Sequence, residues 1–168
     1  MDSGWARETR ACHTIDLRPD LLAALRAYID LHELQGAEAG ALVCFETTSR
    51  RTKKPSLTER MAGGGFKMLV QAVLVTPTRL VWAQATDDDE AFARSELLAK
   101  LEVTDYEKGG MFDLMPDHGV EVQGITAQGR VGTVFFGLGE GPDADRARSV
   151  LKTAVKAAHG EGPPVTAT

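Results

Sequence analysis

The basic side chains of this 168-residue chain are concentrated in one stretch, residues 50–67. This stretch holds six basic residues and one acidic residue, so its formal charge is +5 in a chain whose net charge is −5. Positive charge segregated in this way can attract phosphate or carboxylate groups. The side chains expected to bind such an anion are Arg50, Arg51, Lys53, Lys54 and Lys67. The alternative is an ordinary solvated loop, because charged runs also keep surface loops in water.

The other chemically active residue types do not have the spacing of a catalytic or metal site. The four histidines are scattered, and Cys12 and His13 are adjacent, which suits two ligands of one tetrahedral metal poorly. The chain contains neither a GxSxG motif nor a GxxxxGK[ST] phosphate loop. We therefore predict no catalytic residue, no metal and no cofactor. Cys12 and Cys44 form no CxxC pair, and we expect two reduced thiols.

Two consecutive aromatic residues, Phe135 and Phe136, give the one indication of an interface. Neighbouring side chains of a regular strand point to opposite faces, so one of these rings should lie outside the core. The N-terminal helix is the expected cover for that ring, and a partner subunit is the alternative.

Two amphipathic helices are predicted on either side of a β-rich region. The first covers residues 19–35, where Pro19 suits a first helical turn and Gly36 suits a stop. The second precedes Gly160, and its acidic residues come before its basic ones, as the helix dipole favours. Its apolar stripe is formed by Ala147, Val150, Leu151, Ala154, Val155 and Ala158.

Seven β-strands are predicted between these helices from β-branched and alternating runs. The clearest pair is a hairpin of residues 66–75 and 79–85. Its corner contains Pro77, which cannot donate a hydrogen bond into a sheet. The other predicted strands are residues 41–48, 92–98, 101–106, 120–125 and 131–138.

The domain organisation expected from these elements is simple. We predict one domain over residues 19–160, an irregular N-terminal arm over residues 1–18 and a disordered tail over residues 161–168. The 43% hydrophobic and 26% charged residues are typical of a soluble globular protein. The negative net charge argues against nucleic-acid binding. With no apolar run of about 20 residues and no signal-peptide pattern, the expected location is the cytoplasm.

The order of these elements resembles the bacterial pleckstrin-homology-like domains. The resemblance rests on residues 73–83, VLVTPTRLVWA, and on the glycine-bounded strands at 119–124 and 132–138. It covers residues 39–159 and implies an α+β fold that is mainly β. The expected architecture is an antiparallel barrel or roll of about seven strands with a C-terminal capping helix. The N-terminal helix is extra to that common core.

The resemblance also implies a function, since such domains are binding modules more often than enzymes. We expect non-catalytic binding of a protein or peptide, or self-association, through an exposed strand edge or the added helix. The alternative is peripheral binding to anionic lipid headgroups through the basic loop 50–54. In eukaryotic pleckstrin-homology domains, residues that hold phosphoinositides often lie in a similar loop. A third possibility is an enzyme with a small-molecule pocket.

Overall fold

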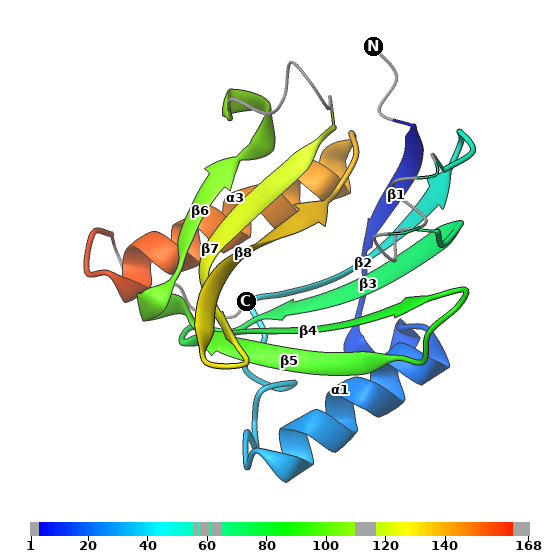
Figure 1. The fold of residues 1–168 in the computed structure, drawn as a ribbon. Helices are drawn as coiled ribbons and strands as arrows, with labels where there is room; N and C mark the ends of the chain where they lie inside the picture. Colours follow the sequence, from blue (N-terminus) through cyan, green and yellow to red (C-terminus); the bar gives the residue numbers. More distant parts are fainter. Residues whose placement is uncertain (1–3, 56, 58–60, 62–64, 110–116, 163–168) are drawn as a thin grey trace.

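The computed structural model describes residues 4–55, 57, 61, 65–109 and 117–162. These residues form an α+β fold that is mainly β, with two antiparallel sheets and two α-helices (Figure 1). Sheet A contains, in spatial order, β1 (Trp5–Ala11), β2 (Val43–Arg51), β3 (Met68–Val75), β4 (Arg79–Thr86) and β5 (Phe92–Leu97). Sheet B contains β6 (Glu102–Asp105), β7 (Gly119–Ala127) and β8 (Arg130–Gly137). The helices are α1 (Pro19–Leu31), between β1 and β2, and α3 (Pro142–Ala158).

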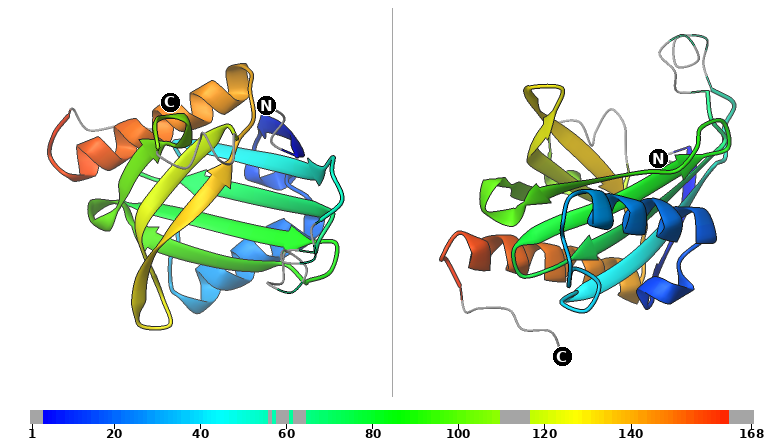
Figure 2. Two further views of the ribbon diagram at one scale, coloured as in Figure 1. Left: turned by 45° about the horizontal axis from the view of Figure 1, so that its top comes forward. Right: turned by 90° about the horizontal axis from the view of Figure 1, so that it is seen from below.

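Sheet A is covered on both faces, so the molecule has three layers (Figure 2). Helix α1 crosses the outer face and buries Leu21, Leu25 and Ile29, the apolar stripe of its sequence. The sheet residues in this outer cluster are Cys44, Val70, Ala72, Leu74, Val81, Ala83 and Ala85. Burial on both faces explains why the central strands are apolar almost without interruption rather than alternating.

The main core lies between the inner face of sheet A, sheet B and α3. Trp82 of β4 meets Phe136 of β8 edge to face, with ring centres 5.9 Å apart, an arrangement that aromatic pairs favour. Helix α3 buries Ala144, Ala147, Leu151, Ala154 and Val155 against this core. The stripe predicted from the sequence therefore faces the core, as its spacing requires.

A side-chain hydrogen bond fixes the turn between β3 and β4. The Thr76 hydroxyl oxygen accepts hydrogen bonds from the backbone N–H groups of Thr78 at 3.3 Å and Arg79 at 2.9 Å. Threonine hydroxyls commonly stabilise turns in this way. The turn sets Val75 opposite Leu80. The hairpin predicted over residues 66–85 is confirmed by β3 and β4.

The hairpin of β7 and β8 contains a tight turn and a bulge. Gln128 and Gly129 have φ angles of 49° and 72°, the positive values of a type I′ turn. Gly124 has a φ of 93° and lies where the register shifts between β7 and β8. A Cβ atom at this glycine would fall on the carbonyl oxygen of Lys100. Glycine is thus required here by both conformation and space.

The structure corrects several expectations. Residues 1–18 were expected to form an irregular arm, but residues 5–11 form β1 and residues 14–16 form a 3-10 turn. The strands form two separate sheets and do not close into a barrel. Helix α1 ends at Leu31 rather than at residue 35, and Glu33, just after it, has a φ of 55°. The tail expected over residues 161–168 lies outside the described residues from residue 163 onward. No helix in the described part of the chain is long and apolar enough to cross a membrane.

Candidate functional site

The basic residues predicted to bind an anion lie together at one end of sheet A. Arg50 and Arg51 are the last residues of β2, and Lys67 directly precedes β3, its antiparallel neighbour. The Arg51 backbone N–H donates a hydrogen bond to the Lys67 carbonyl at 2.8 Å, which holds the two strand ends together. Lys53 and Lys54 follow in the connection. All of these side chains are exposed except Arg51, which is half-buried.

Aromatic rings pack against this basic end. The guanidinium carbon of Arg51 lies 4.6 Å from the centre of the Trp5 ring, and that of Arg7 lies 5.4 Å from it. The Phe66 ring centre is 5.5 Å from that of Trp5. Contacts of this kind are favourable cation–π interactions. They hold Arg51 against β1.

The two phenylalanines do lie on opposite faces of β8. Phe136 is 1% exposed in the main core, so it is not available to a partner of the folded chain. Phe135 is half-buried on the other face, where its ring centre lies 4.7 Å from that of Tyr106. The guanidinium carbon of Arg7 lies 5.5 Å from the same ring. The expected cover, helix α1, lies instead on the outer face of sheet A.

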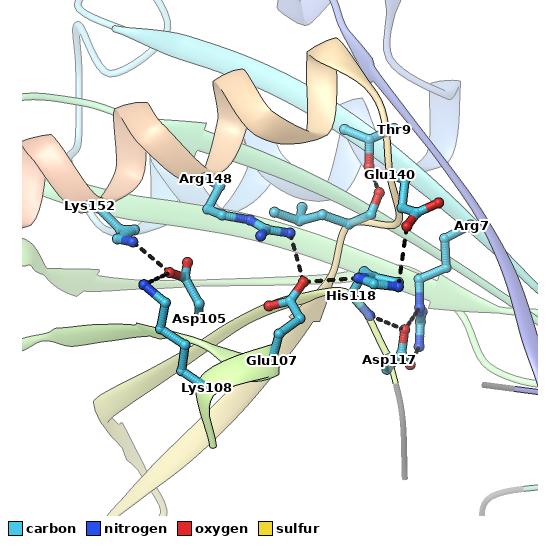
Figure 3. Close-up of polar contacts among 11 residues, drawn as sticks. Arg7, Thr9, Asp105, Glu107, Lys108, Asp117, His118, Glu140, Arg148 and Lys152 are labelled. Carbon is cyan, nitrogen blue, oxygen red and sulfur yellow. Dashed lines mark hydrogen bonds and ion pairs between the residues drawn. The ribbon is translucent and has the colours of Figure 1, made fainter. Parts of the chain in front are cut away.

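A network of charged side chains joins β1, sheet B and α3 (Figure 3). Its members are Arg7, Asp105, Glu107, Lys108, Asp117, His118, Glu140, Arg148 and Lys152. Toward the C-terminal half of α3, Lys152 Nζ lies 2.9 Å from Asp105 Oδ2. One turn earlier on the same helix, Arg148 Nη2 lies 3.1 Å from Glu107 Oε1. These pairs hold α3 to the end of β6.

His118 and Asp117 extend this network toward β1. His118 Nδ1 lies 3.1 Å from Glu107 Oε1, and its Nε2 lies 3.4 Å from Glu140 Oε1. Asp117 accepts hydrogen bonds from Arg7 Nε at 2.8 Å and Arg7 Nη2 at 2.5 Å. Positive and negative groups alternate throughout, so the network offers little net charge to a ligand. Its arrangement suits it to positioning β1 and α3.

Asp105 shows the balance of forces in the network. Burial disfavours its charged form, but hydrogen bonds from Lys152 and Lys108 outweigh burial and hold the pKa of Asp105 below its ordinary value. Three buried atoms lack a hydrogen-bond partner among the described residues: Asp105 Oδ1, Glu107 Oε2 and Arg148 Nε. Groups of this kind usually require a bound water.

A cavity lies at the C-terminal end of β1, where residues 38–44 and the start of α3 also line it. It is an open pocket of about 830 Å³. Arg10, His13, Asp16, Glu38 and Arg146 are charged or titratable residues of its lining. Cys12 and Cys44 also line it, with their Sγ atoms 4.0 Å apart. In the part of the chain that the structure describes, no three His, Cys, Asp or Glu side chains are grouped to hold a metal ion.

The first half of β8 is an open sheet edge. Among the described strands, β8 pairs with β7 alone. Residues 130–133 are all exposed, including Val131, which is 74% exposed. In the type I′ turn the pair Ala127 and Arg130 exchange both backbone hydrogen bonds, and such bonds alternate along the strand. The N–H and C=O groups of Val131 and Thr133 therefore point toward the free edge.

Several of these features could not be found from the sequence. The only sequence signal for strand β1 was the alternation that places Trp5, Arg7 and Thr9 on one face. This signal is weak, because only Trp5 of the three is apolar. Cys12 and Cys44 lie side by side because β1 pairs with β2, so their proximity could not be predicted without predicting β1. The ion network combines residues from five separate segments with no shared motif.

Comparison with known proteins adds no assignment. No family model matches the chain, and no curated protein matches its sequence.

Proposed function

We propose that the chain is a non-catalytic binding module that takes an extended segment of a protein partner onto the free edge of β8. The observation that carries this proposal is the exposed edge at Val131 and Thr133. Unpaired backbone groups in a row are a template for another strand, and peptide recognition domains use such edges. Main-chain hydrogen bonds supply affinity, and the exposed Val131 side chain supplies an apolar contact.

The other sheet edges are protected. β1 is flanked by the segment after β8: Thr9 Oγ1 donates to the Leu138 carbonyl at 2.6 Å, and the Ala11 N–H donates to Asp143 at 2.9 Å. β5 carries Arg94 and Glu96 on the inner face, and inward-pointing charges are a common protection of edge strands. β6 is four residues long and lies beside α3 (Figure 1). The start of β8 has no comparable protection among the described residues.

The order of elements supports the resemblance to pleckstrin-homology-like domains. Strands β2–β5 form consecutive neighbours in one sheet, β6–β8 form a second sheet, and α3 follows. Strand β1 and helix α1 are additions at the N-terminal end. A module of this kind is expected to bind a partner without catalysing a reaction.

The test compares two substitutions at one position. Val131→Pro removes an outward-facing donor without breaking the ladder to β7, whereas Val131→Thr keeps the donor and the β-propensity. Sedimentation velocity first measures self-association over a range of concentrations. Selection from a displayed library of random heptapeptides then supplies ligands for fluorescence titration.

We expect Val131→Pro to weaken self-association or peptide binding by at least about tenfold, and Val131→Thr to leave it within about twofold. Equal binding by both variants would show that the edge is not the site. Failure to find any peptide, together with a monomer at all concentrations, would also contradict the proposal.

A second candidate function, binding to an anionic membrane surface, is favoured by a separate observation. The connection that carries Lys53 and Lys54 also contains Leu57 and Met61, whose side chains are 74% and 81% exposed. Exposed apolar residues among cations are typical of peripheral membrane contact.

Vesicle cosedimentation tests this second function. We expect binding to phosphatidylserine-containing vesicles and none to phosphatidylcholine vesicles, with loss at high salt. Lys53→Glu with Lys54→Glu should abolish it. The control Arg146→Glu with Lys156→Glu changes the net charge equally at other exposed positions and should retain binding. An equal loss of vesicle binding in both double variants would show that binding depends on net charge and not on the basic loop.

A further inference from the structure

Cys12 and Cys44 are cross-strand neighbours, although 31 residues separate them in the sequence. The register of β1 and β2 places Ala11 opposite Phe45, so the next pair is Cys12 and Cys44. The Cys12 N–H donates to the Cys44 carbonyl at 3.0 Å, which continues the ladder through this pair. The two Sγ atoms lie 4.0 Å apart.

The antiparallel pairing brings the two residues within the range in which disulfides form. Opposite residues at a hydrogen-bonded position of an antiparallel ladder have Cα atoms about 5.5 Å apart. That separation lies within the range of disulfides, about 4.4–6.8 Å. Closing the bond from an Sγ separation of 4.0 Å therefore requires rotation of the side chains and a closer approach of the two sulfur atoms.

The two thiols differ in their access to solvent. Cys12 is half-buried and opens into the pocket of about 830 Å³, whereas Cys44 is 7% exposed and packs in the cluster beneath α1. A reagent in the pocket thus reaches Cys12 more readily than Cys44.

The electrostatics favour the same order. A hydrogen bond from the Cys44 thiol, with the nearby Arg10 guanidinium, lowers the pKa of Cys12, although burial opposes the shift. That same hydrogen bond, together with burial, raises the pKa of Cys44. Thiolates are the reactive form of cysteine, so Cys12 is the better nucleophile.

We propose that Cys12 and Cys44 form a reversible redox pair, in which Cys12 reacts with a hydroperoxide and Cys44 resolves the product into a disulfide. The Cys12 thiolate attacks the terminal peroxide oxygen, the O–O bond breaks, and the leaving alkoxide or hydroxide takes a proton from solvent. Cys12 becomes a sulfenic acid. Cys44 sulfur then attacks Cys12 sulfur, the S–O bond breaks, and hydroxide leaves as water with the Cys44 proton. Two thiols lose two electrons, and the peroxide gains them.

The test treats the reduced full-length protein with hydrogen peroxide, then alkylates free thiols and measures the intact mass. We expect both thiols to escape alkylation, with a mass lower by two hydrogen atoms, and dithiothreitol to restore them. Peptide mapping should show the bond between residues 12 and 44 within one chain. Thiols that stay open to alkylation, or that are bonded between chains, would overturn the proposal.

Single substitutions test the order of reaction. Cys44→Ser should leave a sulfenic acid on Cys12 that dimedone captures. Cys12→Ser should protect Cys44 from the same peroxide concentration. Equal oxidation of the lone thiol in both variants would contradict the assigned roles. Should either variant lose its native circular dichroism, titration of the wild type in glutathione redox buffers decides the question. A two-electron transition without bound glutathione supports the pair, and a stable mixed disulfide opposes it.

Discussion

Arg7 and Asp117, 110 positions apart in sequence, form a two-pronged ion pair that links β1 to the start of β7. The side chains are only 8% and 14% exposed. Arg7 Nη1 also donates to Ser49 Oγ at 2.6 Å, so the guanidinium group is held from two sides. This planar, two-bond geometry is the arrangement in which arginine binds a carboxylate best.

Asp117→Ala should therefore destabilise the protein strongly, because it leaves Arg7 buried without its counter-charge. We expect a loss of about 3–5 kcal/mol in the free energy of unfolding, measured by urea denaturation. Asp20→Ala is the control, since Asp20 pairs with Arg18 at the surface and such pairs contribute about 1 kcal/mol or less. Similar losses in the two variants would contradict the structural importance of the Arg7 pair.

Gly124 and Gly132 offer a matched comparison within one hairpin. Gly124→Ala puts a methyl group on the Lys100 carbonyl and forces alanine into a positive φ. We expect a loss of about 2–3 kcal/mol or more. A methyl group at Gly132 meets nothing within 4 Å, so Gly132→Ala should change stability by about 0.5 kcal/mol or less. Thermal unfolding followed by circular dichroism distinguishes the two, and a neutral Gly124→Ala would refute the bulge.

Helix α1 should contribute directly to the stability of sheet A. Leu21 is fully buried against the outer face, so Leu21→Ala should cost about 2–5 kcal/mol. Leu31, at the end of the same helix, is 78% exposed, and Leu31→Ala should be nearly neutral. Chemical denaturation measures both. If the two substitutions had equal effects, α1 would not be docked as described.

Asp105 should give the protein part of its acid sensitivity. Its pKa is lower in the folded chain than in the unfolded chain, so its stabilisation is present above about pH 4 and is lost as pH falls through the folded value. Asp105→Asn should lower stability at neutral pH and flatten its decline in acid. Lys152→Met should flatten the same decline, because it removes the main partner. Urea denaturation across acidic pH measures these slopes, and an unchanged slope in both variants would contradict the assignment.

The sequence predicted best those elements whose buried residues form a pattern within a short stretch of chain. The hairpin of β3 and β4 and the stripe of α3 have patterns that a short window contains, and both were predicted. β1 was not, because its inward face carries Arg7 and Thr9, whose partners Asp117 and Leu138 lie more than a hundred residues away. Polar inward residues give no hydrophobic alternation, so only the folded structure identifies the strand. The barrel was expected from the resemblance, and strand patterns in a sequence do not show whether two sheets close on each other.

The position of β1 has a consequence for the order in which the protein folds during synthesis. Strand β1 precedes the other described strands and pairs with β2, but its other contacts are with Asp117, Leu138 and Asp143, the last of these 132 positions after its partner Ala11. Strands β1–β5 can pair as each one is synthesised, because neighbours in sheet A are also neighbours along the chain. The contacts of β1 with Leu138 and Asp143 can form only after the start of α3 has been translated. Until then β1 lacks its contacts with sheet B and with the start of α3.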